Sequence, residues 1–73
     1  MFRWSVRMQE AFTGRQIQEH TEVESCEYLV AAKAKAGYER QHKTVCTLDT
    51  AGLDWLLILP TGRIAAVVRI RAE

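Results

Sequence analysis

The sequence predicts an α+β fold, a mainly antiparallel sheet of four to five strands (order ββαβββ) with one helix packed on one face. Three observations lead to this prediction. Residues 2–9 alternate apolar and polar side chains with the period of two that is typical of a half-buried strand. Residues 25–36 are rich in helix formers. Two apolar runs, residues 55–59 and 64–70, flank a Pro-Thr-Gly turn sequence.

The first strand is expected to have one apolar face and one polar, partly basic face. The apolar face consists of Phe2, Trp4, Val6 and Met8, and the polar face of Arg3, Ser5, Arg7 and Gln9. A turn follows at residues 12–15, where Gly14 can take a positive φ. Residues 15–23 suit a second strand that folds back on the first. A helix start is the alternative for residues 15–24, because Thr21 and Glu24 have the spacing of a capping box.

The helix is predicted over residues 25–36, with Ser25 as its N-cap and Gly37 just past its end. Its core-facing residues are expected to be Cys26, Leu29, Val30 and Ala34. The alanines make this helix slim, so it can lie close to a sheet but covers little apolar area. The predicted core of the protein comprises Phe2, Trp4, Val6, Cys26, Leu29, Val30 and either Leu56 or Leu57.

Three further strands are predicted, over residues 42–49, 53–59 and 63–71. The hairpin formed by the last two admits two registers. A three-residue loop with a bulge, favoured by the turn chemistry, places Trp55 opposite Val67. A two-residue loop, favoured by the charges, places Trp55 opposite Val68 and Asp54 opposite Arg69.

In either register, both faces of this hairpin carry large apolar side chains. One slim helix can cover only one face, so we expect the other face to meet a second copy of the chain or a partner. The last strand is also a potential sheet edge, at which Arg69 and Arg71 would discourage unlimited pairing. A homodimer, or a monomer that reserves this face for its target, is the expected state.

Composition narrows the class of protein. Seventy-three residues with 48% apolar side chains are expected to form a single domain, residues 1–73. A net charge of +1 argues against a general polyanion binder and against an acidic DNA mimic. The sequence shows neither a signal-peptide apolar region nor a run long enough to span a bilayer, and two cysteines make no disulfide framework. A cytoplasmic location without membrane association is therefore expected.

No motif for catalysis, metal binding or cofactor binding emerges. His42 and Cys46, four residues apart on a predicted strand, would lie about 13 Å apart, too far to share a metal ion. Ser5 and Ser25 lie outside any nucleophile-elbow context, and the four glycines are isolated in turns. We therefore expect a protein that is not an enzyme and carries no metal and no cofactor.

The arginines give the stronger functional signal. If the first and last strands are neighbours, Arg3, Arg7, Arg63, Arg69 and Arg71 share one sheet surface. A guanidinium group donates two parallel hydrogen bonds to a carboxylate or a phosphate. Base stacking on this surface would need exposed aromatic residues, and only Trp55 could serve. A protein partner is therefore favoured over a nucleic acid or the rim of a homodimer.

The order strand, strand, alanine-rich helix and three-stranded meander resembles small phage-encoded anti-CRISPR proteins of the type I inhibitor kind. Within it, TVCTLDTAGLDWLLILPTGR is similar to the meander of one such inhibitor. The resemblance implies a non-enzymatic protein that docks on a CRISPR surveillance complex and blocks DNA access with basic and aromatic residues. Trp55 and Arg63 are the matching positions.

The leading hypothesis is thus a small binding protein that inhibits a larger nucleic-acid-handling complex by occlusion. The alternatives are a direct DNA- or RNA-binding module and a homodimeric interaction protein. The predicted partner-binding residues are Arg3, Arg7, Trp55, Arg63, Arg69 and Arg71.

Overall fold

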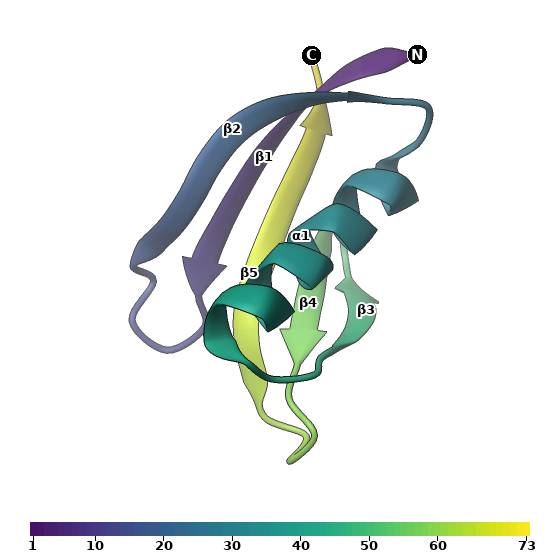
Figure 1. The fold of residues 1–73 in the computed structure, drawn as a ribbon. Helices are drawn as coiled ribbons and strands as arrows, with labels where there is room; N and C mark the ends of the chain where they lie inside the picture. Colours follow the sequence, from purple (N-terminus) through teal and green to yellow (C-terminus); the bar gives the residue numbers. More distant parts are fainter.

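Five strands form one antiparallel sheet in the order β2-β1-β5-β4-β3, and a single helix packs on one face (Figure 1). The computed structural model describes all 73 residues. The elements are β1 (Phe2–Glu10), β2 (Gln16–Glu24), α1 (Glu27–His42), β3 (Thr47–Ala51), β4 (Asp54–Ile58) and β5 (Ile64–Ala72). The predicted α+β class and the ββαβββ order are confirmed.

The first hairpin forms as the alternating pattern predicts. Val6 and Met8 of β1 are buried, and β2 pairs with β1 along its whole length. The connecting turn closes with Gly14 at φ 70°, where its N–H donates to the Glu10 carbonyl at 3.0 Å. Residues 16–24 are strand, so the alternative of a helix start in this segment is wrong.

The last strand of the chain, β5, lies in the centre of the sheet between β1 and β4. Its expected role as a sheet edge is therefore wrong, and the edges are β2 and β3. The central position suits the sequence of β5, because alternate residues Ala66, Val68 and Ile70 are buried under the helix. Both chain termini lie at the same end of the sheet (Figure 1).

The β4–β5 hairpin combines features of the two predicted registers. At its tip Leu59 and Arg63 enclose a three-residue loop, with the Leu59 N–H donating to the Arg63 carbonyl at 2.8 Å. A bulge then shifts the register by one residue between Leu57 and Ile58, so that Trp55 pairs with Val68. The turn chemistry thus decides the tip, and the register favoured by the charges holds beyond the bulge.

The helix is longer than predicted and begins and ends at other residues. It runs through Gly37 to His42, and Lys43 supplies the left-handed C-terminal residue at φ 50°. The N-cap position belongs to Cys26, which makes no side-chain capping bond, so Ser25 is not the cap. Because the helix and its cap occupy residues 27–43, β3 begins at Thr47 rather than at residue 42.

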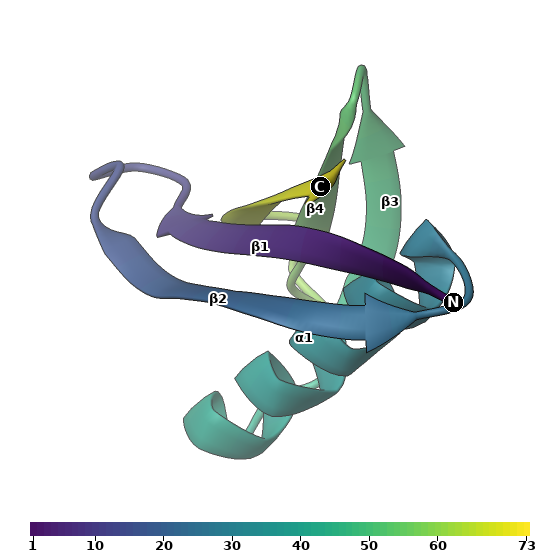
Figure 2. The ribbon, with the colours of Figure 1, turned by 90° about the horizontal axis from the view of Figure 1, so that it is seen from above.

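The core lies between α1 and the covered face of the sheet. Its ten buried side chains are Val6, Met8, Val30, Ala31, Ala34, Cys46, Leu57, Ala66, Val68 and Ile70. The sheet is strongly twisted, so that β3 runs steeply to β1 and β2 when seen from above (Figure 2). This twist leaves the corners of the sheet outside the cover of one helix.

Three predicted core residues are exposed in the structure. Phe2, at the start of β1, is 61% exposed, and its ring meets that of Trp4 edge-on. Leu29 is 40% exposed because the helix turns Val30, rather than its neighbour, toward the sheet. Cys26 precedes the first helical turn and is also exposed. Of the remaining predictions, Val6, Val30 and Leu57 are buried, and Trp4 is half-buried.

No helix of the protein has the length and apolar character needed to cross a membrane.

Candidate binding surfaces on the sheet

The face of the sheet that α1 leaves uncovered, hereafter the open face, is the first candidate surface. Its strands contribute Arg3, Ser5, Arg7 and Gln9 of β1, Val67, Arg69 and Arg71 of β5, Asp54, Leu56 and Ile58 of β4, Thr47 and Asp49 of β3, and Glu19, Thr21 and Val23 of β2. The alternation of side chains along each strand puts these residues opposite the buried ones. The prediction that one sheet face stays uncovered by the helix is confirmed.

A row of four charges crosses the open face from β2 to β4. Arg7 and Arg69 stand opposite each other on β1 and β5. Arg7 is paired with Glu19, whose Oε2 lies 2.9 Å from the arginine Nε. Arg69 is paired with Asp54, whose Oδ1 lies 3.5 Å from its Nε. The two like charges at the centre are therefore each accompanied by a carboxylate on the outer side.

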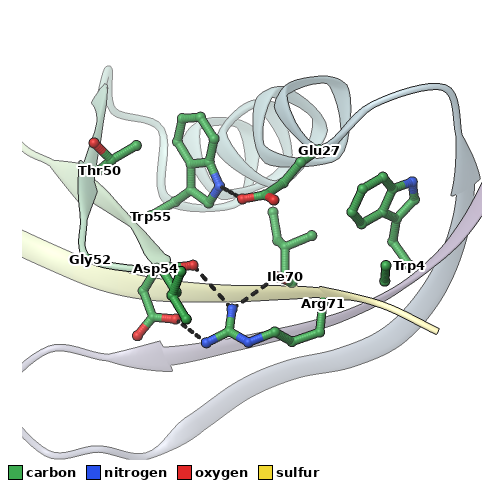
Figure 3. Close-up of a pocket in the computed structure, with 10 residues that line it drawn as sticks. Trp4, Glu27, Thr50, Gly52, Asp54, Trp55, Ile70 and Arg71 are labelled. Carbon is green, nitrogen blue, oxygen red and sulfur yellow. Dashed lines mark hydrogen bonds and ion pairs between the residues drawn. The ribbon is translucent and has the colours of Figure 1, made fainter.

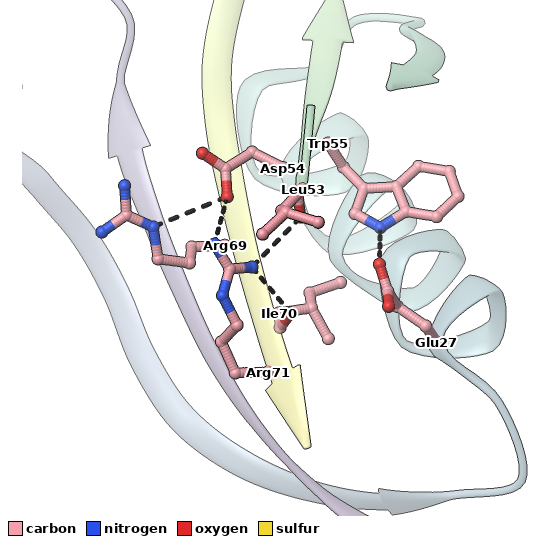
Figure 4. Close-up of polar contacts among 7 residues, drawn as sticks. All are labelled: Glu27, Leu53, Asp54, Trp55, Arg69, Ile70 and Arg71. Atoms are coloured by element: carbon pink, nitrogen blue, oxygen red, sulfur yellow. Dashed lines mark hydrogen bonds and ion pairs between the residues drawn. The ribbon is translucent and has the colours of Figure 1, made fainter. Parts of the chain in front are cut away.

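Arg71 fastens the end of β5 to the turn between β3 and β4 (Figure 4). Its Nη2 donates to the Asp54 Oδ1 at 2.9 Å, and its Nη1 donates to the carbonyl oxygens of Leu53 at 3.1 Å and Ile70 at 2.9 Å. Asp54 thus serves both Arg69 and Arg71. A guanidinium group with three such acceptors has a structural role in addition to any contact with a partner.

An apolar patch lies beside this row of charges, toward the tip of the β4–β5 hairpin. Leu56 of β4 pairs with Val67 of β5, and Ile58 follows Leu56 on the same face. All three side chains are half-buried by their neighbours. Together with the buried Leu57 and Val68 on the helix side, they give the β4–β5 hairpin the large apolar groups expected on both of its faces.

Two of the six predicted partner-binding residues do not lie on the open face. Trp55 points to the helix side of β4 and donates from its Nε1 to Glu27 Oε2 at 2.6 Å. Arg63 precedes β5 and lies over the ring of Phe12, 4.4 Å from its centroid. The expectation that five arginines share one surface is wrong for Arg63, because the loop before β5 carries it beyond the paired strands. Arg3, Arg7, Arg69 and Arg71 do share it.

A cleft at one end of the sheet is the second candidate surface, and the sequence did not indicate it. The cleft has a volume of about 270 Å³ and lies between the start of α1 and the strand ends near the chain termini (Figure 3). Trp4 and Trp55 line it on two sides, with Ile70 and Glu27 between them. Leu53 and Arg71 complete the rim. These residues come from four separate elements, so no local motif could have revealed the cleft.

Both indole N–H groups of the cleft have fixed acceptors. Trp4 Nε1 donates to the backbone carbonyl of Glu24 at 3.1 Å, and Trp55 Nε1 donates to the Glu27 carboxylate. Glu27 is half-buried, and no Lys, Arg or His side chain forms an ion pair with it. The walls of the cleft are thus oriented by hydrogen bonds, and its carboxylate has no cationic partner within the chain.

His42 and Cys46, the two possible metal ligands of the sequence, differ in their exposure to solvent. The His42 ring stacks on Tyr38 with the ring centroids 4.1 Å apart, and Cys46 is buried. Burial raises the pKa of the Cys46 thiol above its ordinary value, and the nearby Glu39 carboxylate adds to the effect. No group of three or more His, Cys, Asp or Glu side chains is placed to hold a metal ion.

These two surfaces must be interpreted from their own chemistry, because comparison with known protein families, curated proteins and solved structures finds no match to this chain.

Proposed function

We propose that the protein is a small non-enzymatic binding module that docks through its open face on a protein surface of a larger nucleic-acid-handling complex and inhibits that complex by occlusion. The observation that supports this proposal is the pairing of three open-face arginines, Arg7, Arg69 and Arg71, with carboxylates beside an apolar patch. Such a mixture of arginine and apolar side chains is typical of protein interfaces.

The same pairing argues against direct binding to a nucleic acid backbone. Arg7, Arg69 and Arg71 would have to leave Glu19 and Asp54 before they could neutralise phosphates. Glu19 and Asp54 would also repel the phosphates. Nucleic-acid surfaces gain most of their affinity from arginines and lysines that are free to release counterions. A protein partner can instead accept the existing ion pairs as part of its interface.

The dimensions of the molecule agree with an interface that uses the whole open face. The principal extents are 35 × 22 × 20 Å, so one face offers an area on the order of the ~800 Å² per partner that specific complexes bury. An occluding inhibitor of this size has to engage most of one face. The choice of a nucleic-acid-handling complex as partner, with a type I CRISPR surveillance complex as the first candidate, rests on the resemblance in layout to anti-CRISPR proteins.

The proposal is tested with purified type I surveillance complexes and two variants that each add one positive charge. We expect the wild-type protein to co-elute with such a complex and to reduce its binding to target DNA. Leu56→Lys places a charge in the apolar patch, opposite Asp49, and should abolish both effects, because the desolvation of a charge in an interface is costly even where it has a partner. Gln41→Lys, on the exposed side of α1, should change neither.

Two results would contradict the proposal. Co-elution that survives Leu56→Lys would remove the open face as the docking surface. A mobility shift of free DNA by the protein alone, strengthening as salt is lowered, would instead favour the direct nucleic-acid-binding alternative.

A further inference from the structure

Aromatic side chains gather at the cleft rather than in the core. None of the ten buried residues is aromatic. Trp4 and Trp55 line the cleft, and each is in edge-on contact with a second aromatic ring outside it. Phe2 lies 6.2 Å from Trp4, and Tyr28 lies 6.1 Å from Trp55, between ring centroids. Trp4 and Trp55 pack one side against the core and leave the rest of their apolar area on the cleft, where it is available to a ligand.

The cleft also contains an unmatched negative charge. Glu27 points into the space between the two indoles, and its only side-chain partner is the neutral Trp55 N–H. Arg71 at the rim does not supply the missing cation, because its guanidinium group is turned to Asp54 and to two carbonyl oxygens. A positively charged group that entered the cleft would therefore meet a carboxylate that no cation of the chain already occupies.

From these two observations we infer that the cleft binds a cationic side chain, arginine or lysine, presented by a protein partner. Indole faces attract a cation through their quadrupole, and the carboxylate between them supplies a charge-assisted hydrogen bond. Ile70 gives an apolar floor for the aliphatic stem. Arginine is the better fit, since its planar guanidinium group stacks on an aromatic ring while its fork contacts the carboxylate. This site borders the open face at Asp54 and Arg71, but its binding groups, Trp4, Trp55 and Glu27, lie outside that face, and it does not depend on the proposed docking there.

The test uses N-acetyl-arginine amide, N-acetyl-lysine amide and, as the neutral isostere of arginine, N-acetyl-citrulline amide. The chain has two tryptophans, so its NMR spectrum contains two indole N–H signals, one from each wall of the cleft. We expect both signals to shift saturably with the arginine probe, with a dissociation constant in the millimolar range, and more weakly with the lysine probe. The citrulline probe should leave them in place.

Glu27→Gln is the decisive variant. It keeps an oxygen that can accept from Trp55 Nε1 but removes the charge, and we expect it to weaken arginine binding about fivefold or more. Glu19→Gln removes one negative charge from the open face and should leave the affinity unchanged, as should Leu56→Lys. Trp4→Leu provides a second approach, because it removes one wall and should weaken the shift that the Trp55 indole signal reports.

Each opposite result would overturn the inference. Citrulline that binds as tightly as arginine would show that the cleft recognises shape and not charge. Unchanged affinity in Glu27→Gln, or an equal loss in Glu19→Gln, would show that Glu27 plays no specific part. Indole signals that do not move with either cationic probe would mean that the cleft is not a cation site.

Discussion

At the residue scale, Glu39 is the side chain that joins the end of α1 to the start of β3. Its Oε2 accepts the Cys46 N–H at 2.7 Å and lies 3.0 Å from Lys35 Nζ. The hydrogen bond from the Cys46 backbone, followed by that from Lys35, lowers the pKa of Glu39 below its ordinary value of 4.5. The unfolded chain therefore binds this proton at a higher pH than the folded protein does.

The resulting prediction concerns stability in acid. The contribution of Glu39 is complete above its ordinary pKa of 4.5 and is lost as the pH falls from there through the lower folded pKa. Glu39→Gln should therefore show a smaller fall of the thermal midpoint than the wild type over this acid range. Glu73→Gln, at the exposed chain end, is the control. Its thermal midpoint should fall with pH as that of the wild type does. Parallel curves for Glu39→Gln and wild type would contradict the assignment.

Single residues were predictable from the sequence where a simple period decides their position. The alternation in β1 correctly placed Val6 and Met8, and the helical stripe correctly placed Val30. Leu29 was misplaced because neighbouring helix positions differ only in how the helix rotates on the sheet, which no local pattern specifies. The cleft was missed for a related reason, since Glu27 and Trp55 are separated by 28 positions in sequence and meet only when α1 crosses the sheet.

At the scale of elements, the helix shows why a glycine is an ambiguous stop signal. Gly37 was expected just past the helix end, but the helix continues for five more residues to His42. The actual end is set by Lys43 in the left-handed region and by the Glu39 carbonyl, which accepts the N–H groups of Lys43 and Thr44. These are tertiary and cap features that follow from the position of β3.

Gly37→Ala should stabilise the protein. An added Cβ at this position meets no atom within 4 Å, and alanine favours a helix interior over glycine by about 1 kcal/mol. Gly62→Ala is the matched contrast, because Gly62 has a φ of 88° that alanine rarely adopts, and it should destabilise by about 1 kcal/mol or more. Chemical denaturation measures both. Equal changes in the free energy of unfolding would show that the backbone conformation of the two glycines does not decide the effect of an added Cβ.

The β4–β5 hairpin was predictable in its parts but not in their combination. Pro60 and Gly62 specify the loop, and Asp54 with Arg69 specify the pairing farther along the strands. The two preferences differ by one residue, and the bulge beside Leu57 accommodates the difference. Sequence patterns indicate the loop length and the charge pairing separately. The presence of a bulge depends on how the loop and the paired strands fit together in the twisted sheet.

At the scale of the whole molecule, the order of elements and the covered face followed from the sequence, whereas the strand order did not. The central position of β5 brings Arg69 beside Arg7 and Asp54, and it creates the paired charges of the open face. The alternation along each strand shows which arginines share a face. It does not show which carboxylates of neighbouring strands lie next to them. For this reason the arginines were correctly grouped, apart from Arg63, while the balance of charge across the face became visible only in the fold.

We predict that the protein is a monomer of 8.4 kDa at micromolar concentration. The apolar patch of the open face is small, and the arginines beside it would meet one another in many self-paired arrangements. Of the two sheet edges, β3 has only five residues, and β2 carries Glu19, Glu22 and Glu24, so that pairing of two β2 strands would bring acidic residues together. Multi-angle light scattering measures the mass directly. A mass of twice this value would show that the open face or an edge serves self-association, and it would reduce the area left free for a partner.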